Sequence, residues 1–198
     1  MPTWSTRYVR LRDRRVDLDR LKRLSAPEAH ALIHAEEGSP YAASTVQTSV
    51  LVPDDLSELS RTFSEAFSVQ VHSVADLVIY DHFREGERTR GLSYAGEAGW
   101  VRVVGAPEAW ETGFFFAPEK LQHLLHELQD DFSDEAVLAR DTAEIKRLFA
   151  AAELEEGNTR PVTHWRAFAQ AIARHYGFAD PVPSSASSTR IPQVKPKS

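Results

Sequence analysis

The feature that most constrains the fold is a succession of three β-prone runs between residues 76 and 116. The runs are 76–83, 92–94 and 100–104. They are rich in aromatic and β-branched residues and are separated by turns that contain glycine, a pattern typical of an antiparallel meander. Trp100 and Trp110 lie in this stretch and supply half of the chain's four tryptophans. We therefore expect a meander over residues 76–104 at the centre of the core.

The patterns on either side of the meander predict an α+β protein with a mostly antiparallel sheet of about five strands. Alternation of side chains predicts further strands at 3–11, 44–52 and 69–74. Apolar stripes at helical spacing behind capping residues predict helices at 25–37, 54–67, 118–128, 133–152 and 163–176. Residues 12–24 fit either a short helix or a loop. Because strands come first and helices last, the pattern favours α+β over a parallel α/β fold.

The domain organisation follows from the same patterns. We expect one globular domain over residues 1–180, strand-rich over 1–116 and helical over 117–178. Residues 181–198 are rich in proline and serine and lack acidic and aromatic side chains. Such a composition cannot bury enough apolar surface to fold, so it predicts a disordered tail.

Composition excludes several classes of function. The chain contains no cysteine, which excludes disulfides, thiolate catalysis and cysteine-ligated zinc. No apolar run approaches the roughly 20 residues that span a bilayer, and residues 1–5 lack the order of a signal peptide. We find no phosphate loop, dinucleotide fingerprint or hydrolase elbow, and we expect no cofactor. Without cysteine or a signal peptide, a cytoplasmic location is the default expectation, and the Ala/Arg/Glu-rich composition suggests a bacterial protein.

Charge is distributed unevenly along the chain. Residues 1–24 hold eight basic and three acidic residues, whereas residues 127–156 hold ten acidic and three basic ones. The two segments are either solvated faces, which could pair with each other across the fold, or a polar surface that binds a protein partner. The net charge of −6 makes nucleic-acid binding unlikely. In the partner interpretation, the binding residues include Asp130, Asp131, Asp134 and Glu135.

Two pairs of histidines have the spacing of neighbours on a helix. His30 and His34 are four residues apart, with Glu37 one turn further, and His123 and His126 are three apart. Metal sites use such spacing, but the segment 30–34 lacks the glutamate of a metalloprotease motif. We interpret both pairs as surface histidines and expect no metal site.

Asp81 and His82 are candidate site residues within the first run of the meander. If Leu77, Ile79 and Phe83 face the core, alternation places Asp81 with them and His82 on the opposite face. A buried carboxylate needs a partner, and Arg90 and Arg102 on the neighbouring strands are candidates. The alternative is an acid/base pair in a cleft, which would also need a nucleophile or a metal.

The segment after the meander supplies a second set of candidates. Glu108 and Glu111 flank Trp110 just behind the turn at 105–107, so they are placed to line a groove for a ligand or a peptide. The alternative is that Trp110 simply covers the edge of the sheet. Trp100 is included among the candidate binding residues.

Two classes of function remain. The first is a non-catalytic interaction or regulatory protein, such as an adaptor or a toxin-neutralising (immunity) protein, which we favour because no catalytic signature is present. The second is a small-molecule binder or hydrolase with a pocket between the meander and the C-terminal helices. A pocket that brings Asp81, His82, Glu108 and Glu111 together would favour the second class, and their separation on different faces would count against it.

Overall fold

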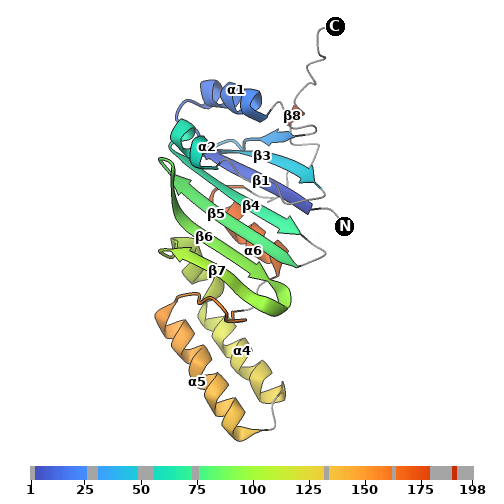
Figure 1. Cartoon of the computed structure of the whole chain (residues 1–198), viewed down its shortest axis with the longest axis vertical. Coiled ribbons are helices and arrows are strands. Elements are labelled where there is room, and N and C mark those ends of the chain that lie inside the picture. Colours follow the sequence, from blue (N-terminus) through green and yellow to red (C-terminus); the bar gives the residue numbers. More distant parts are fainter. Residues whose placement is uncertain are drawn as a thin grey trace.

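A single antiparallel sheet forms the body of the molecule (Figure 1). The computed structural model describes residues 3–25, 31–48, 56–72, 76–131, 134–161, 164–178 and 189–190. The strands are β1 (Thr3–Arg10), β2 (Leu32–His34), β3 (Tyr41–Thr48), β4 (Glu65–His72), β5 (Leu77–Arg84), β6 (Glu87–Ala95), β7 (Gly99–Gly105) and β8 (Thr189–Arg190). Their order across the sheet is β7-β6-β5-β4-β1-β3-β2-β8. Seven strands and a two-residue edge strand extend the predicted number of about five, and the α+β class is confirmed.

The helices cover the sheet at different places. They are α1 (Arg14–Ser25), α2 (Leu56–Phe63), α3 (Ala109–Phe115), α4 (Pro118–Asp131), α5 (Glu135–Ala151) and α6 (Trp165–His175), with a 3-10 turn, η1, at Gly96–Ala98. Figure 1 shows α6 behind the sheet, α1 and α2 near one end, and the α4–α5 hairpin projecting beyond β7 at the other end. Among the described residues, none of these helices has both the length and the apolar character needed to cross a membrane.

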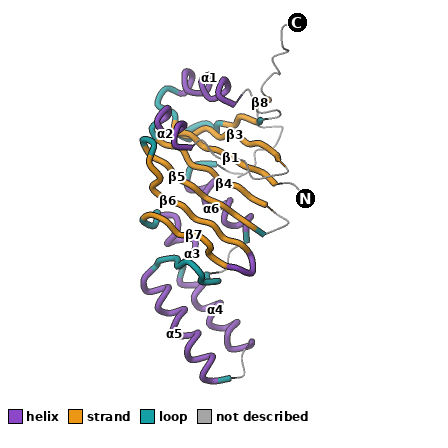
Figure 2. The backbone as a smooth tube through the Cα atoms, viewed as in Figure 1, coloured by secondary structure: helices purple, strands orange, loops and turns teal. Residues whose placement is uncertain are grey.

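The predicted meander is confirmed as β5, β6 and β7, each paired antiparallel with the next. Glu85 and Gly86 join β5 to β6, and both have positive φ, at 49° and 91°. Two-residue hairpin turns of this kind match the twist of the strands, and glycine tolerates the conformation best. Gly99 begins β7 at a close approach, because a Cβ there would lie 2.4 Å from the carbonyl oxygen of Asn158. The α5–α6 loop therefore lies against β7 (Figure 2).

Both faces of the sheet bury apolar side chains. On one face, Tyr8, Phe67 and Tyr80 belong to the larger core with Phe168 and Ile172 of α6. On the other face, a smaller core packs α1 and α2 against the sheet; it contains Val9, Leu21, Leu59, Phe63 and Ala66. Burial on both sides explains why β4 is buried along almost its whole length. It also means that simple alternation cannot identify the face that carries a site.

Several predictions in the N-terminal half are wrong. The helix expected over 25–37 is not formed in its second half, where Leu32–His34 is a strand paired with β3. Residues 26–30, and with them His30, lie outside the described part. The open question at 12–24 is settled in favour of helix α1, which ends at Ser25. The helix predicted over 54–67 extends too far, since α2 ends at Phe63 and β4 follows after one residue.

The C-terminal helices are close to their predicted positions. The predicted caps Ser133 and Thr163 lie outside the described residues, and Asp134 and His164 are the N-caps of α5 and α6. The carboxylate of Asp134 accepts hydrogen bonds from the amides of Ala136 and Val137. Of the predicted tail over 181–198, only Thr189–Arg190 are described, and they pair with β2.

Candidate functional site

Tyr80 and His82, rather than Asp81, face the larger core. They alternate on β5 with Val78, and all three are at most 1% exposed. This reverses the predicted faces of β5. The reason is that α6 and α3 pack on the Tyr80–His82 side, where the rings of Phe67 and Tyr176 contact His82 edge-on. Aromatic neighbours and a buried imidazole thus share the more enclosed face of the sheet.

His82 bridges two carboxylates. Its Nε2 lies 2.9 Å from Glu65 Oε1 on β4, and its Nδ1 contacts Glu108 Oε1, the residue that precedes α3. Burial alone would lower the pKa of the His82 imidazole, but the hydrogen bonds and negative charges of the two glutamates outweigh burial and raise the pKa. A protonated imidazole donates from both nitrogens. Glu65, His82 and Glu108 thus form a continuous carboxylate–imidazolium–carboxylate chain.

Glu108 is held by three further donors. Its Oε2 accepts hydrogen bonds from the Tyr80 hydroxyl at 2.6 Å and from the Trp110 indole N–H at 2.7 Å, and the Tyr176 hydroxyl lies 3.4 Å away. Burial would raise the pKa of the Glu108 carboxyl, but the hydrogen bonds from His82, Tyr80 and Trp110 lower it. The carboxylate therefore stays ionised and fixed in orientation.

Glu65 is equally constrained, although it comes from the other side of His82. Arg84 donates to its Oε1 at 3.1 and 3.3 Å, and Arg10 donates to its Oε2 at 3.2 Å. Burial opposes ionisation of Glu65, but the hydrogen bond and charge of His82, the charge of Arg84 and the hydrogen bond of Tyr41 lower the pKa to about 2. A carboxylate with so low a pKa is a weak base near neutral pH.

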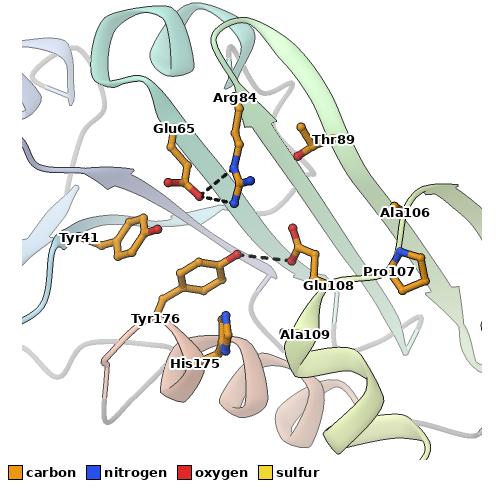
Figure 3. A pocket seen from close by; sticks show the side chains of 10 residues that line it. All are labelled: Tyr41, Glu65, Arg84, Thr89, Ala106, Pro107, Glu108, Ala109, His175 and Tyr176. Carbon is orange, nitrogen blue, oxygen red and sulfur yellow. Dashed lines mark hydrogen bonds and ion pairs between the residues drawn. The ribbon is translucent and has the colours of Figure 1, made fainter. Parts of the chain in front are cut away.

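These residues form the wall of a pocket. The pocket has a volume of about 490 Å³ and lies where β3, β4 and β5 meet the start of α3 and the end of α6. Its lining residues are Tyr41, Glu65, Arg84, Thr89, Ala106, Pro107, Glu108, Ala109, His175 and Tyr176. Figure 3 shows the Arg84 guanidinium reaching between the two glutamates, with Tyr41, Tyr176 and His175 across from it. Its volume is within the range of small-molecule sites.

A buried ion pair positions the pocket wall from behind. Arg90 on β6 donates from Nε and Nη2 to the two carboxylate oxygens of Glu111, at 2.8 and 2.5 Å. Glu111 Oε1 also accepts from the backbone amide of Glu108, completing a capping box at the start of α3. The pair thus fixes the backbone that carries Glu108. Glu111 was predicted to line a groove, but it lies behind the pocket.

Asp81 lies on the opposite face of the sheet and takes no part in the pocket. Its carboxylate pairs with Arg102 at 2.8 Å and with Arg88 at 3.0 Å. The predicted pairing with Arg102 is thus found, whereas Arg90, the other candidate, pairs with Glu111. Of the four residues that were to share a pocket, only Glu108 lines the cavity, and the buried His82 contacts Glu108 from behind.

The other candidate residues do not line the pocket. Trp100 is fully buried, and its indole N–H donates to the carbonyl of Pro161 at 3.3 Å. Asp134 and Glu135 are exposed at the start of α5, and Asp130 and Asp131 end α4. His34 lies on strand β2 beside Glu36 and its side chain is only 11% exposed, so the prediction of a surface histidine on a helix is wrong for His34. His123 pairs with Glu127 on the exposed side of α4.

Sequence reasoning missed the residues that complete the pocket. They are Tyr41, Glu65, Arg84 and Tyr176. Glu65 carries no clear sequence signal, because β4 also contains Ser68, Gln70 and His72, and only the fold shows that its side chain is 4% exposed. No sequence pattern links it to Tyr176, which comes more than 100 residues later.

The site shows no arrangement typical of a metal centre. Within the described ranges, no three histidine or carboxylate side chains converge as metal ligands. Both nitrogens of His82 already face glutamates. Comparison of the chain with protein-family models, curated proteins and solved structures found no match.

Proposed function

We propose that this chain binds a small polar molecule in the pocket between β4–β5 and the ends of α3 and α6. The observation that supports the proposal best is the hydrogen-bonded chain Glu65–His82–Glu108, which fixes two walls of a 490 Å³ cavity before any ligand arrives. Preorganised polar groups avoid the entropic cost of ordering them on binding. This is the second of the two classes that the sequence left open.

The ionisation states of the side chains in the site favour ligand binding over hydrolysis. The pKa of Glu65 is about 2 and that of Glu108 is lowered, so neither carboxylate is a strong base. Burial raises the pKa of the Tyr176 hydroxyl, which makes it a poor acid. Efficient general acid–base groups have pKa values near the working pH. The two carboxylates instead keep their charge near neutral pH, as in a recognition site.

The proposal is tested by searching for small molecules that bind in the pocket. A fragment screen followed by amide chemical shifts should identify compounds that perturb residues 106–109 and 175–176. Ala109→Trp places a large ring at the pocket wall and should abolish those shifts. Ala143→Trp is the matched control, since Ala143 is an exposed alanine on α5 away from the pocket. A library without a single binder at these residues, or binding that survives Ala109→Trp, would refute the proposal.

A second candidate is the interaction function, which we propose for the α4–α5 hairpin. The supporting observation is its position: the hairpin projects past the sheet, at the opposite end of the molecule from α1 (Figure 1). The acidic hairpin and the basic α1 therefore do not neutralise each other. Exposed acidic side chains on a projecting hairpin suit a basic protein partner, because complementary charge accelerates association.

A further inference from the structure

The hydrogen-bond acceptors of the pocket are largely used by the protein itself. Glu108 Oε2 faces three donors, and Glu108 Oε1 contacts His82. Glu65 Oε1 accepts from His82 and Arg84, and Glu65 Oε2 accepts from Arg10. A cationic ligand would have to displace one of these internal donors. The two glutamates therefore do not favour a cation, in spite of their charge.

The donors of the pocket are, by contrast, still available. Arg84 uses Nε and Nη2 on Glu65, and within the described part of the chain its Nη1 forms no hydrogen bond or ion pair. The Arg84 side chain is 60% exposed, so a ligand can reach this nitrogen. In Figure 3 the guanidinium reaches between Glu65 and Glu108, and the imidazole of the exposed His175 lies across the hollow. Donors thus outnumber free acceptors.

The formal charge around the pocket agrees with this count. The cations Arg10, Arg84 and protonated His82 contact the two carboxylates of Glu65 and Glu108, which leaves one positive charge. The remaining wall combines the polar side chains of Thr89 and His175 with an apolar and aromatic part formed by Ala106, Pro107, Ala109 and the rings of Tyr41 and Tyr176. A single charge beside an apolar wall matches a monoanion with an apolar body.

On this basis we infer that the pocket takes a small monocarboxylate, whose carboxylate oxygen accepts from Arg84 Nη1 and whose apolar body lies against Pro107 and the tyrosine rings. The inference rests on the proposed function and specifies its ligand class. A phosphate monoester shares the anionic oxygens but carries up to two charges, which exceeds the single uncompensated charge of the site. Arginine recognises both groups through charge-assisted hydrogen bonds.

Four probes with the same ring test this class: benzoate, phenyl phosphate, benzamide and benzylamine. Calorimetry and amide shifts at residues 106–109 give affinity and location. We expect benzoate to bind at least tenfold more tightly than benzamide, because its carboxylate forms a charge-assisted hydrogen bond with Arg84 that the neutral amide does not form. Phenyl phosphate should bind more weakly than benzoate, and benzylamine, a cation near neutral pH, most weakly.

Variants at two arginines show whether the preference comes from the predicted contact. Arg84→Gln should make the affinities of benzoate and benzamide equal, and Arg84→Lys should restore part of the difference. Arg12→Gln is the control, because Arg12 is an exposed arginine that pairs with Glu85 outside the pocket. Circular dichroism checks that each variant is folded.

The outcomes distinguish an error in the ligand class from an error in the proposed function. Preference for benzylamine or benzamide, or a benzoate preference that survives Arg84→Gln, overturns the ligand class but leaves a small-molecule pocket. Tighter binding of phenyl phosphate assigns the site to phosphate esters and likewise overturns the carboxylate. Failure of all four probes at millimolar concentration counts against the class, and the fragment screen with Ala109→Trp then decides the proposed function independently.

Discussion

Arg90 and Glu111 form a bidentate ion pair in which each side chain is only 1% exposed. The remaining guanidinium nitrogen of Arg90, Nη1, donates to the carbonyls of Val104 and Gly105 at the end of β7. Glu111 in turn caps the amide of Glu108. One buried pair thus links β6, the end of β7 and the start of α3, the three segments that set the position of Glu108.

Loss of this pair should destabilise the protein strongly. Arg90→Ala leaves the Glu111 carboxylate buried without its counter-ion, and such losses cost about 3–5 kcal/mol. Chemical denaturation of the variant measures the change in free energy of unfolding. Arg147→Ala, which removes an exposed pair with Glu144 and Glu155, is the control and should unfold much like the wild type. Equal stability of the two variants would contradict the structural role of Arg90.

Removal of Asp81 should cost less than removal of Arg90. Its partners Arg88 and Arg102 have side chains that are 41% and 29% exposed, so water can solvate them once the carboxylate is gone. We expect Asp81→Ala to lower the free energy of unfolding by about 1.5–3 kcal/mol, the range for hydrogen bonds to charged groups. Asp81→Asn should cost less than Asp81→Ala. Urea denaturation measures both changes. Equal losses of free energy of unfolding for Asp81→Ala and Arg90→Ala would contradict the prediction.

The Glu65–His82 contact should contribute most to stability at intermediate pH. Its contribution should fall both as the pH is lowered and as the pH is raised. The pKa of Glu65 falls from 4.5 to about 2 on folding, so its contribution is complete above pH 4.5 and is lost as the pH falls towards 2. The pKa of His82 is raised above 6.5, so its contribution is complete below pH 6.5 and is lost as the pH rises through the folded value. Both contributions coexist between pH 4.5 and 6.5.

We therefore expect the difference in free energy of unfolding between wild type and His82→Gln to be largest in that window. The fall in the pKa of Glu65 from 4.5 to about 2 corresponds to about 3–4 kcal/mol, which is an upper limit for the acid side because Arg84 and Tyr41 also contribute to the fall. Denaturation at a series of pH values measures the difference. His123→Gln, an exposed histidine on α4, is the control and should show no such maximum. If the difference in free energy of unfolding between wild type and His82→Gln does not change with pH, the stability provided by the contact does not depend on the charges of Glu65 and His82.

The interaction function of the α4–α5 hairpin predicts a salt-dependent loss of partner capture. The test variant replaces Asp130, Asp131 and Glu135 with lysine. Asp134 is kept because its carboxylate caps α5. With a partner captured from the native host, the lysine variant should associate more slowly, and the difference should shrink as salt rises, since exposed charges are screened over about 8–10 Å. Asp19→Lys reverses an exposed acidic residue on α1, at the other end of the molecule, and is the matched control. Equal association rates at low salt would exclude this surface.

The sequence by itself determined the elements whose signal is local. The meander over 76–104 was predictable because strand runs and glycine turns encode adjacent antiparallel strands. Helices α4, α5 and α6 were predictable because their leucine and isoleucine spacing gives one apolar face. The class of the fold follows from the order of these elements. Glu108 and Trp110 stood out because two carboxylates flank an aromatic ring just after a strand.

Only the tertiary structure decided which faces are enclosed and which distant residues meet. Strand β2 replaced the second half of a predicted helix because Leu32–His34 pairs with β3, and pairing overrides local propensity. Alternation separated His82 from Asp81 correctly but could not say which of them faces α6, since both faces of the sheet carry a core. Glu65 and Tyr176 join His82 only because β4 pairs with β5 and α6 packs behind them. A pocket built from such distant contacts leaves no local pattern in the sequence.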